Sequence, residues 1–303
     1  GYELSLSWRD EFQLLRRPFT YSVTVTFNDY VTDITKYDNP DRTFAKSYYE
    51  GMRWGEIWGY RIGGLFATDA EAAGYAVDQT AVNNRINAAA GSERGLPAGD
   101  LKFLDLDGDN VISIGKNTVD DPGDMMIIGN TTPRFHYGTT LSMSGAGIDF
   151  SIFFQGIGRR HWYPKANTIA FWGPYARPYA SWIPKDFHEM YWSEENPDAY
   201  FPRPRSYVAL SGTNRELTAV NDRYMQNIRY CRLKNLTIGY TLPKKWTRKV
   251  LIENLRVYFT GENLATWSPI HSDYIDPEMA AMNDEMRTYP WQKTYMFGVD
   301  GTL

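Results

Sequence analysis

Cysteine is almost absent from this sequence, which contains a single thiol, Cys231, in 303 residues. One cysteine excludes an internal disulfide. We interpret Cys231 as a small packed side chain rather than a reactive thiol, because free cysteines usually behave as small apolar residues. The four histidines are scattered without metal-ligand spacing. The sequence also lacks a phosphate-binding glycine loop, a nucleophile elbow and a Cys/His pair, and it therefore predicts a protein that is not an enzyme.

Long hydrophobic runs and strong net charge are missing as well. No run approaches the ~20 apolar residues that a membrane helix needs, which excludes a helical membrane protein. The formal net charge of −4 is small and gives no sign of a nucleic-acid partner. No signal peptide is visible at the N-terminus, where residues 1–8 already alternate like a strand. We therefore expect this chain to be the later portion of something longer.

Aromatic residues are abundant, by contrast, and apolar and polar residues alternate in several segments. Aromatics make up 16% of the chain, with 22 tyrosines and 10 tryptophans. Alternation with a period of two is typical of β-strands that have two different faces. Together with the turn residues it predicts an all-β chain of about eight strands, at residues 2–8, 19–28, 56–66, 135–143, 148–154, 227–242, 253–267 and 292–303.

The last predicted strand illustrates the two faces. Its apolar face carries Tyr295, Phe297, Val299 and Leu303. Its other face carries Thr294, Met296, Asp300 and Thr302. A membrane barrel would place lipid outside and water inside such a strand, but a soluble β-sandwich with one face in its core produces the same alternation. We expect this strand, which runs to the last residue, to be the closing strand of a barrel whose first strand is not in this chain.

Short and long connections alternate between the predicted strands of the second half. Residues 145–147 and 243–251 form short turns, and the basic pair Lys244 and Lys245 in the second is most simply a polar cap. Residues 67–132, 159–226 and 268–291 are long connections. Outer-membrane barrels have tight periplasmic turns and long external loops, so we predict that these three connections lie on the external side. The side occupied by residues 29–55 stays open.

The segment from Asp105 onward has the spacing of a calcium-binding loop. Oxygen ligands are expected at alternate positions, from Asp105, Asp107, Asp109 and the Val111 backbone. Asn110 occupies the sixth position, where the backbone must turn. Lys116 replaces the usual glutamate at the twelfth position, for which Asp120, Asp121 or Asp124 are candidate substitutes. The alternative is an aspartate-rich surface turn that satisfies its own backbone. A bound calcium would be structural, and no other cofactor is expected.

Residues 161–207 form the densest aromatic stretch of the chain. Its tryptophans, Trp162, Trp172, Trp182 and Trp192, are candidates for contact with a ligand or a partner. Exposed aromatic rings stack on sugars and also anchor protein interfaces. The alternative, which we favour for most of these rings, is that they pack on each other to hold a long loop over a barrel mouth.

Several sequence motifs, taken in order, resemble the SusC/RagA family of TonB-linked outer-membrane transporters of the Bacteroidetes. Two examples are Leu-Lys-Asn-Leu-Thr-Ile-Gly-Tyr at 233–240 and Leu-Arg-Val-Tyr-Phe-Thr-Gly-Glu-Asn-Leu at 255–264. The other motifs lie at 48–60, 64–66, 105–112, 127–133, 137–142, 153–156 and 289–291. Each motif is weak alone, but their order and spacing cover nearly the whole chain. The family commonly ends on an aromatic residue, whereas this chain ends on Leu303.

The resemblance implies that residues 1–303 are the C-terminal part of a large antiparallel transmembrane β-barrel with long extracellular loops. The plug domain and the N-terminal strands would be absent from this chain, which would supply roughly a third of a ~22-stranded barrel. The implied function is TonB-dependent import of oligomeric nutrients, glycans or in some members peptides, across the bacterial outer membrane. The implied partners are a SusD-like surface lipoprotein, the TonB complex acting through the missing plug, the oligosaccharide or peptide ligand, and outer-membrane lipid.

Within that interpretation, the inward-facing side chains would line the lumen. The candidates are Thr237, Arg256, Tyr258 and Asp300. Their assignment depends on strand register, because a slip of one residue exchanges the two faces. Two other functions stay open from the sequence: a soluble all-β carbohydrate-binding module or glycosidase, and a passive porin.

Overall fold

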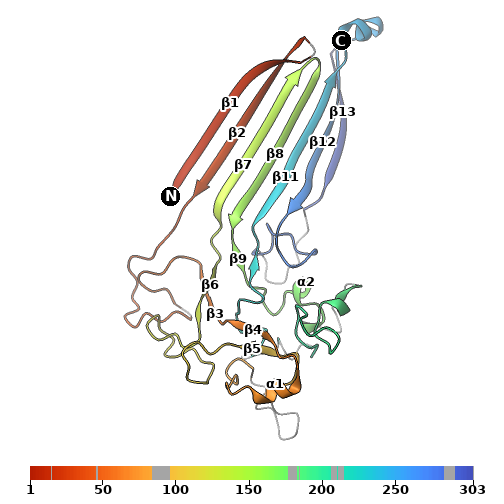
Figure 1. The fold of residues 1–303 in the computed structure, drawn as a ribbon. Coiled ribbons are helices and arrows are strands. Elements are labelled where there is room, and N and C mark those ends of the chain that lie inside the picture. The colour runs from red at the N-terminus through yellow and green to blue at the C-terminus, as the bar shows by residue number, and fades with distance from the viewer. Residues whose placement is uncertain are drawn as a thin grey trace.

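Seven long strands form one antiparallel sheet in the computed structural model of the chain (Figure 1). In their order across the sheet they are β1 (Tyr2–Leu14), β2 (Arg17–Asp29), β7 (Arg134–Gly145), β8 (Ile148–Arg159), β11 (Tyr230–Thr241), β12 (Asn254–Trp267) and β13 (Thr294–Thr302). The structure describes residues 1–14, 16–45, 47–83, 96–176, 183, 185–205, 210, 215–282 and 291–302. No helix among these residues is long and apolar enough to cross a membrane.

Strand register gives the sheet one polar face and one apolar face. One row of register partners crosses all seven strands and is mostly polar: Arg9, Ser22, Ser142, Ser151, Thr237, Thr260 and Met296. The adjacent row, which is shifted by one residue along each strand, is mostly apolar: Trp8, Val23, Leu141, Ile152, Leu236, Gly261 and Tyr295. Because side chains alternate along a strand, the two rows lie on opposite faces. The alternation predicted from the sequence is therefore kept in register across the sheet.

The connections at one end of the sheet are short. β7 and β8 are joined by Ala146 and Gly147, within the short turn predicted at residues 145–147. Their φ angles of 53° and 87° are those of a two-residue hairpin turn. β11 and β12 are joined through the helix α3 (Lys244–Thr247) and a 3₁₀ turn at Arg248–Val250. Both connections lie at the end of the sheet that is drawn at the top of Figure 1.

The three long connections all leave from the opposite end of the sheet (Figure 1). They are residues 30–133, 160–229 and 268–293, and together we call their described residues the cap. The side of residues 29–55 was open from the sequence; Asp29 ends β2, and residues 30–55 are part of the cap connection between β2 and β7. The alternation of short and long connections accordingly extends to the whole sheet.

The cap contains short elements of its own. Its two-stranded sheets are β3 (Glu56–Gly59) with β6 (Met126–Asn130), β4 (Ile62–Leu65) with β5 (Leu101–Phe103), and β9 (His161–Trp162) with β10 (Gln226–Asn227). Its helices are α1 (Asp69–Gly74) and α2 (Ile169–Trp172), with 3₁₀ turns at Gly173–Tyr175 and Phe187–Glu189.

The strand predicted at residues 56–66 is wrong as a member of the main sheet. The segment divides into β3 and β4, which pair with other parts of the cap. Gly59 explains part of the division, since a Cβ there would lie 2.4 Å from Ile128 Cδ1 and 2.6 Å from the Val220 carbonyl oxygen. Close approach of the cap backbone at this point is possible only for glycine. In the described part of the chain, seven strands and not eight therefore form the sheet.

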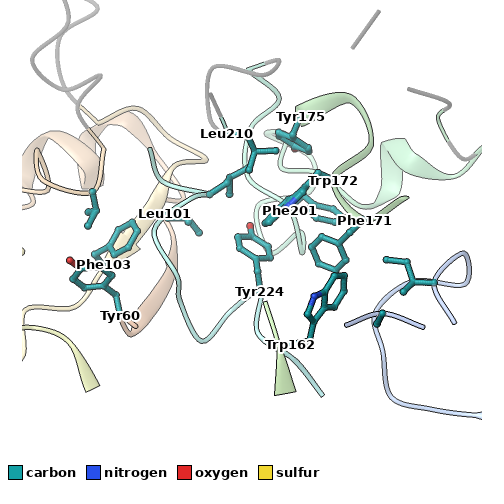
Figure 2. Packing of buried hydrophobic residues seen from close by; sticks show 14 of the residues in the cluster. Tyr60, Leu101, Phe103, Trp162, Phe171, Trp172, Tyr175, Phe201, Leu210 and Tyr224 are labelled. Carbon is teal, nitrogen blue, oxygen red and sulfur yellow. The ribbon is translucent and has the colours of Figure 1, made fainter. Parts of the chain in front are cut away.

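Most of the buried hydrophobic residues lie in the cap rather than on the sheet. One cluster joins all three long connections. Tyr60 and Phe103 come from the first connection and Trp172 and Tyr224 from the second (Figure 2). Ile275 of the third connection belongs to the same cluster. Trp172 and Tyr224 have no exposed surface and pack edge to face at 5.2 Å between ring centroids. The cap is therefore a folded unit with its own core, which the sequence analysis described only as loops.

Ion pairs lie where the cap connections meet the strand ends. Arg134 at the start of β7 donates from Nε to Asp29 Oδ1 at the end of β2 (2.5 Å), and its Nη2 reaches the second carboxylate oxygen. This buried pair joins the two points where the 104-residue connection leaves and re-enters the sheet. Arg232 on β11 contacts Asp276 and Glu278 of the last connection. The two parallel hydrogen bonds between Arg134 and Asp29 are of the strong, charge-assisted kind.

Candidate transport surfaces

The apolar face of the sheet is exposed among the described residues. Its large exposed side chains are Tyr2, Leu4, Leu6, Trp8, Phe12, Leu14, Leu141, Ile148, Ile238, Tyr240, Val257, Tyr295, Phe297 and Val299. Phe297 is 84% exposed, although it lies in the middle of β13 and pairs with Phe259. Asp10 is a charged exception on this face. An uncovered apolar surface of this extent marks an interface with a protein or a membrane.

The polar face is lined by hydroxyl groups that bond across strands. Ser7 and Thr24 lie 3.0 Å apart, Ser142 and Ser151 3.3 Å apart, and Thr237 and Thr260 3.2 Å apart between their hydroxyl oxygens. The Thr237 hydroxyl also lies within hydrogen-bond distance of the Asn235 amide oxygen, which accepts from it at 3.3 Å. Such cross-strand pairs stabilise the sheet while leaving a hydrophilic surface.

Arg256 forms the centre of a charged network on the polar face. Its Nε and Nη2 donate to the two carboxylate oxygens of Asp149 at 2.9 and 2.6 Å, and its Nη1 donates to Asp300 Oδ2 at 3.1 Å. The guanidinium also lies 4.6 Å from the ring centroid of Tyr258. The network joins β8, β12 and β13. Its planar, bidentate geometry holds the three side chains flat against the sheet.

Two glycines make room for this network. A Cβ on Gly239 would lie 2.4 Å from Asp149 Oδ1 and 2.6 Å from Arg256 Nη2. A Cβ on Gly298 would lie 2.2 Å from Tyr258 Cζ. Long side chains from neighbouring strands therefore cross over these two backbone positions, which is a recognised use of glycine inside a strand.

The four lumen candidates from the sequence share the polar face. Arg256, Tyr258 and Asp300 belong to the charged network, and Thr237 lies in the hydroxyl row on β11. Asp149, the bidentate partner of Arg256, was not among the candidates predicted from the sequence. Its position offered a usable signal, because it alternates with Ile148 and Phe150 on β8 and so belongs to the opposite face.

The tryptophans proposed as ligand or partner contacts lie inside the cap. Trp162, Trp172 and Trp192 are all buried, and Trp182 lies outside the described residues. Trp172 donates its indole N–H to the carbonyl oxygen of Lys165 at 3.0 Å. Trp192 packs under the Arg203 guanidinium at 4.6 Å. This placement favours the alternative in which the rings hold the loop together, because a buried ring presents no face to a ligand.

A small cleft opens between the second and third cap connections. Its volume is about 60 Å³, and its walls include Phe171, Phe187 and Phe201 from one connection and His271 and Asp273 from the other. The His271 ring lies 3.6 Å from that of Tyr200, centroid to centroid. Burial lowers the pKa of His271, so the imidazole is neutral at physiological pH. The cleft is thus mostly apolar with a polar rim.

The aspartates of the predicted calcium loop come together. The carboxylates of Asp105, Asp107 and Asp109 lie within 4.8 Å of one another. Asn110 has the left-handed φ of 65° that its position requires. Each carboxylate also accepts a backbone N–H: Gly108 and Asn110 donate to Asp105, Asp109 donates to Asp107, and Val111 donates to Asp109. The hydrogen bonds from Asn110 and Gly108 lower the pKa of Asp105. The four bonds together are compatible with either the ion site or the self-satisfied turn.

The residues considered as substitutes for the twelfth ligand have other contacts. Asp120 pairs with Arg42 and Asp121 with Lys116, each at 3.2 Å. Asp124 is fully buried and accepts the N–H of Leu106 at 2.6 Å and that of Ser113 at 2.8 Å, which ties the two ends of the loop together. Burial raises the pKa of Asp124 in spite of these donors. Calcium binding here stays a prediction.

A sheet with an exposed apolar face and a polar face, capped at one end, has the features that the wall of an outer-membrane β-barrel requires. No protein-family model matches the sequence. Among solved structures, the RagAB peptide transporter is similar with a TM-score of 0.59 and 16% identity, over 98% of this chain and 28% of that chain. The RagAB peptide importer in its open-open state has a TM-score of 0.55, with the same identity and coverage. At this identity the likeness establishes the fold.

Sequence relatives carry the assignment further. TonB-dependent receptor P3 of Formosa agariphila is 26% identical over 326 residues, which cover 99% of this chain and 28% of that protein. TonB-dependent receptor P26 of the same organism is 26% identical over 189 residues, covering 59% of this chain and 16% of that protein. The chain is therefore SusC/RagA-like: it is similar to TonB-dependent receptors, which are proteins of the bacterial outer membrane. It spans about 28% of the length of TonB-dependent receptor P3 and of the RagAB transporter chain.

Proposed function

We propose that residues 1–303 form the C-terminal part of the barrel wall of a TonB-dependent transporter, whose plug and N-terminal strands lie outside this chain. The whole protein would import oligomeric nutrients, glycans or peptides, across the outer membrane. The observation that carries the proposal is the exposed apolar face of a sheet whose opposite face is polar. The strands are long enough to span, since β1 and β2 have 13 residues each and about 9–11 are needed.

In this proposal each surface has a separate task. The apolar face contacts lipid, and the polar face with Arg256, Asp149 and Asp300 lines the lumen. The cap lies outside the cell, where it bounds the ligand chamber and meets a SusD-like lipoprotein lid. The small aromatic cleft beside His271 would contact a small apolar group of a ligand. Transport is binding and gated passage, without bond chemistry.

The rival functions make different demands on the same surfaces. A soluble carbohydrate-binding module would cover the apolar face with a second layer, and the described residues leave it open. A passive porin would have the same two faces, so it is separated from the proposed transporter by its energy requirement alone.

The test is uptake by cells that carry the full-length protein as their means of importing the ligand. Fluorescent oligosaccharides and peptides of matched length are supplied separately, with and without a proton-motive-force uncoupler. We expect uptake of one class and its loss on uncoupling. Uptake that persists after uncoupling would instead identify a porin, and recovery of the protein as a soluble monomer without detergent would overturn the barrel assignment. Pull-down of a surface lipoprotein tests the lid separately.

A further inference from the structure

The connection between β11 and β12 is an exposed helical turn at the end of the sheet opposite the cap (Figure 1). Within six consecutive positions the turn carries four cationic side chains: Lys244, Lys245, Arg248 and Lys249. A charged turn was expected here from the sequence as a simple polar cap. The structure shows that the turn is not simply polar.

Large apolar side chains project from the same turn. Trp246 is 59% exposed, Val250 64% and Leu251 85%. Trp246 and Val250 are four residues apart, so they lie on the same side of the helical turn. Thr247 between them is buried, which fixes the turn against the strand ends and leaves the tryptophan and the valine facing away from the protein. Nothing in the described residues covers these three side chains.

The charges on the turn are largely uncompensated. Lys244 lies 3.6 Å from Glu253, and both side chains are more than half exposed, which makes this a weak surface pair. In the part of the chain that the structure describes, Lys245, Arg248 and Lys249 have no ion-pair partner. The turn therefore combines a local excess of positive charge with exposed apolar surface.

We propose that this turn binds anionic phospholipid headgroups of the adjacent membrane leaflet, with Trp246, Val250 and Leu251 inserted at the boundary of the acyl chains. The turn is continuous with the apolar face of the sheet, because the exposed register partners Tyr240 and Val257 lie next to it on β11 and β12. Tryptophan and apolar side chains prefer the membrane interface, and lysine and arginine attract acidic headgroups. A soluble protein partner would explain the charge but not the continuity with the apolar face.

This inference rests on the proposed membrane placement of the sheet, and the experiment tests the two separately. The full-length protein carries Cys231→Ser and one introduced cysteine, at Val250, at Phe297 on the apolar face, or at Thr302 on the polar face. Each cysteine is labelled with an environment-sensitive fluorophore in nanodiscs of phosphatidylcholine, with or without phosphatidylglycerol. Quenching by lipids that are brominated near the headgroup reports contact with the bilayer surface at position 250, and quenching by lipids that are brominated at the middle of the acyl chain reports contact with the bilayer interior at positions 297 and 302.

We expect quenching at position 250 and at position 297 but not at position 302, and stronger quenching at 250 when phosphatidylglycerol carries the bromine. Quenching at 297 without quenching at 250 would overturn the inference and leave the membrane placement intact. Absence of quenching at both positions would overturn the membrane placement itself. If the cysteine at position 250 were protected from labelling in native membranes but not in nanodiscs, a protein partner would cover the turn. That result would also overturn the inference.

A matched pair of variants tests the charge. Lys245→Gln with Lys249→Gln removes two unpaired cations from the turn, and Lys36→Gln with Lys185→Gln removes two exposed cations from the cap. The first pair should abolish the preference of position 250 for phosphatidylglycerol, measured as the ratio of quenching by the two brominated lipids. The second pair should leave that ratio unchanged. An equal loss in both would mean that net charge, and not this turn, sets the preference.

Discussion

Replacement of Arg232 by methionine should release the last cap connection from the sheet. The Arg232 side chain is 1% exposed and contacts Asp276, and it contacts Glu278 at 3.0 Å. Loss of one partner from a buried ion pair costs about 3–5 kcal/mol, because the remaining charge stays buried without its partner. Lys234 still lies 3.0 Å from Glu278 and retains part of the attachment. We therefore expect a cost of about 3 kcal/mol, which is roughly a 100-fold change in the opening equilibrium.

Hydrogen exchange of the full-length protein in detergent locates this loss. The backbone N–H groups of Met279 and Ala280 donate to the Asp276 carbonyl oxygen, and that of Met282 donates to the Met279 carbonyl oxygen. These amides should exchange roughly 100-fold faster in the Arg232→Met variant, while amides of the main sheet keep their protection. Lys234→Met, which leaves the Arg232 contacts in place, should have a much smaller effect. Unchanged exchange at these three amides would refute the assignment of Arg232 as the fastening residue.

Three further predictions concern the polar face and the cap. Gly298→Ala should displace Tyr258 and lower the melting temperature, at a cost of about 1–3 kcal/mol. Gly301→Ala is the control and should leave the melting temperature unchanged, because its Cβ would lie 3.8 Å from the nearest atom. Equal effects of the two substitutions would contradict the packing argument. Calcium should raise the melting temperature, and a chelator should return it to its starting value. Asp107→Asn should abolish this calcium-dependent rise. If calcium does not change the melting temperature of the unmodified protein, the self-satisfied turn is favoured. The Lys102 ammonium 2.6 Å from Glu71 holds the pKa of that carboxyl below its ordinary 4.5. The Glu71–Lys102 pair therefore contributes fully to stability above pH 4.5, and this contribution is lost as the pH falls through the lowered pKa. Glu71→Gln should flatten the dependence of the melting temperature on pH below 4.5. An unaltered pH dependence would contradict this assignment.

The two-faced strands could be predicted because side-chain alternation is a local property. The faces of β13 and the hairpin turn at Ala146 and Gly147 followed directly from the residues. The order of family motifs along the chain added the barrel. Strand membership was harder, since residues 56–66 alternate as the sheet strands do. Their place in the cap depends on packing against distant residues such as Ile128, which no local pattern reveals.

The cap and the candidate site show the same limit. Tryptophan spacing marked residues 161–207 as important, but whether Trp172 is buried or exposed depends on Tyr224 and Ile275, which lie in other segments of the core. Arg256 was identified on the correct face, yet its partner Asp149 lies 107 residues away in sequence. The exposure of Trp246 is likewise a tertiary property, because the sequence of the turn is compatible with a packed tryptophan.

The central claim, that the sheet separates lipid from a polar interior, is tested most directly by an accessibility scan along β13. Single cysteines at positions 295, 296, 297, 299 and 300 of the full-length protein, in a Cys231→Ser background, are labelled in lipid nanodiscs. Quenchers confined to the acyl chains and quenchers dissolved in water are then compared at each position. Positions 295, 297 and 299 should respond to the lipid quencher, and positions 296 and 300 to the aqueous one. A response without this alternation, or protection of positions 295, 297 and 299 from both quenchers, would contradict the account.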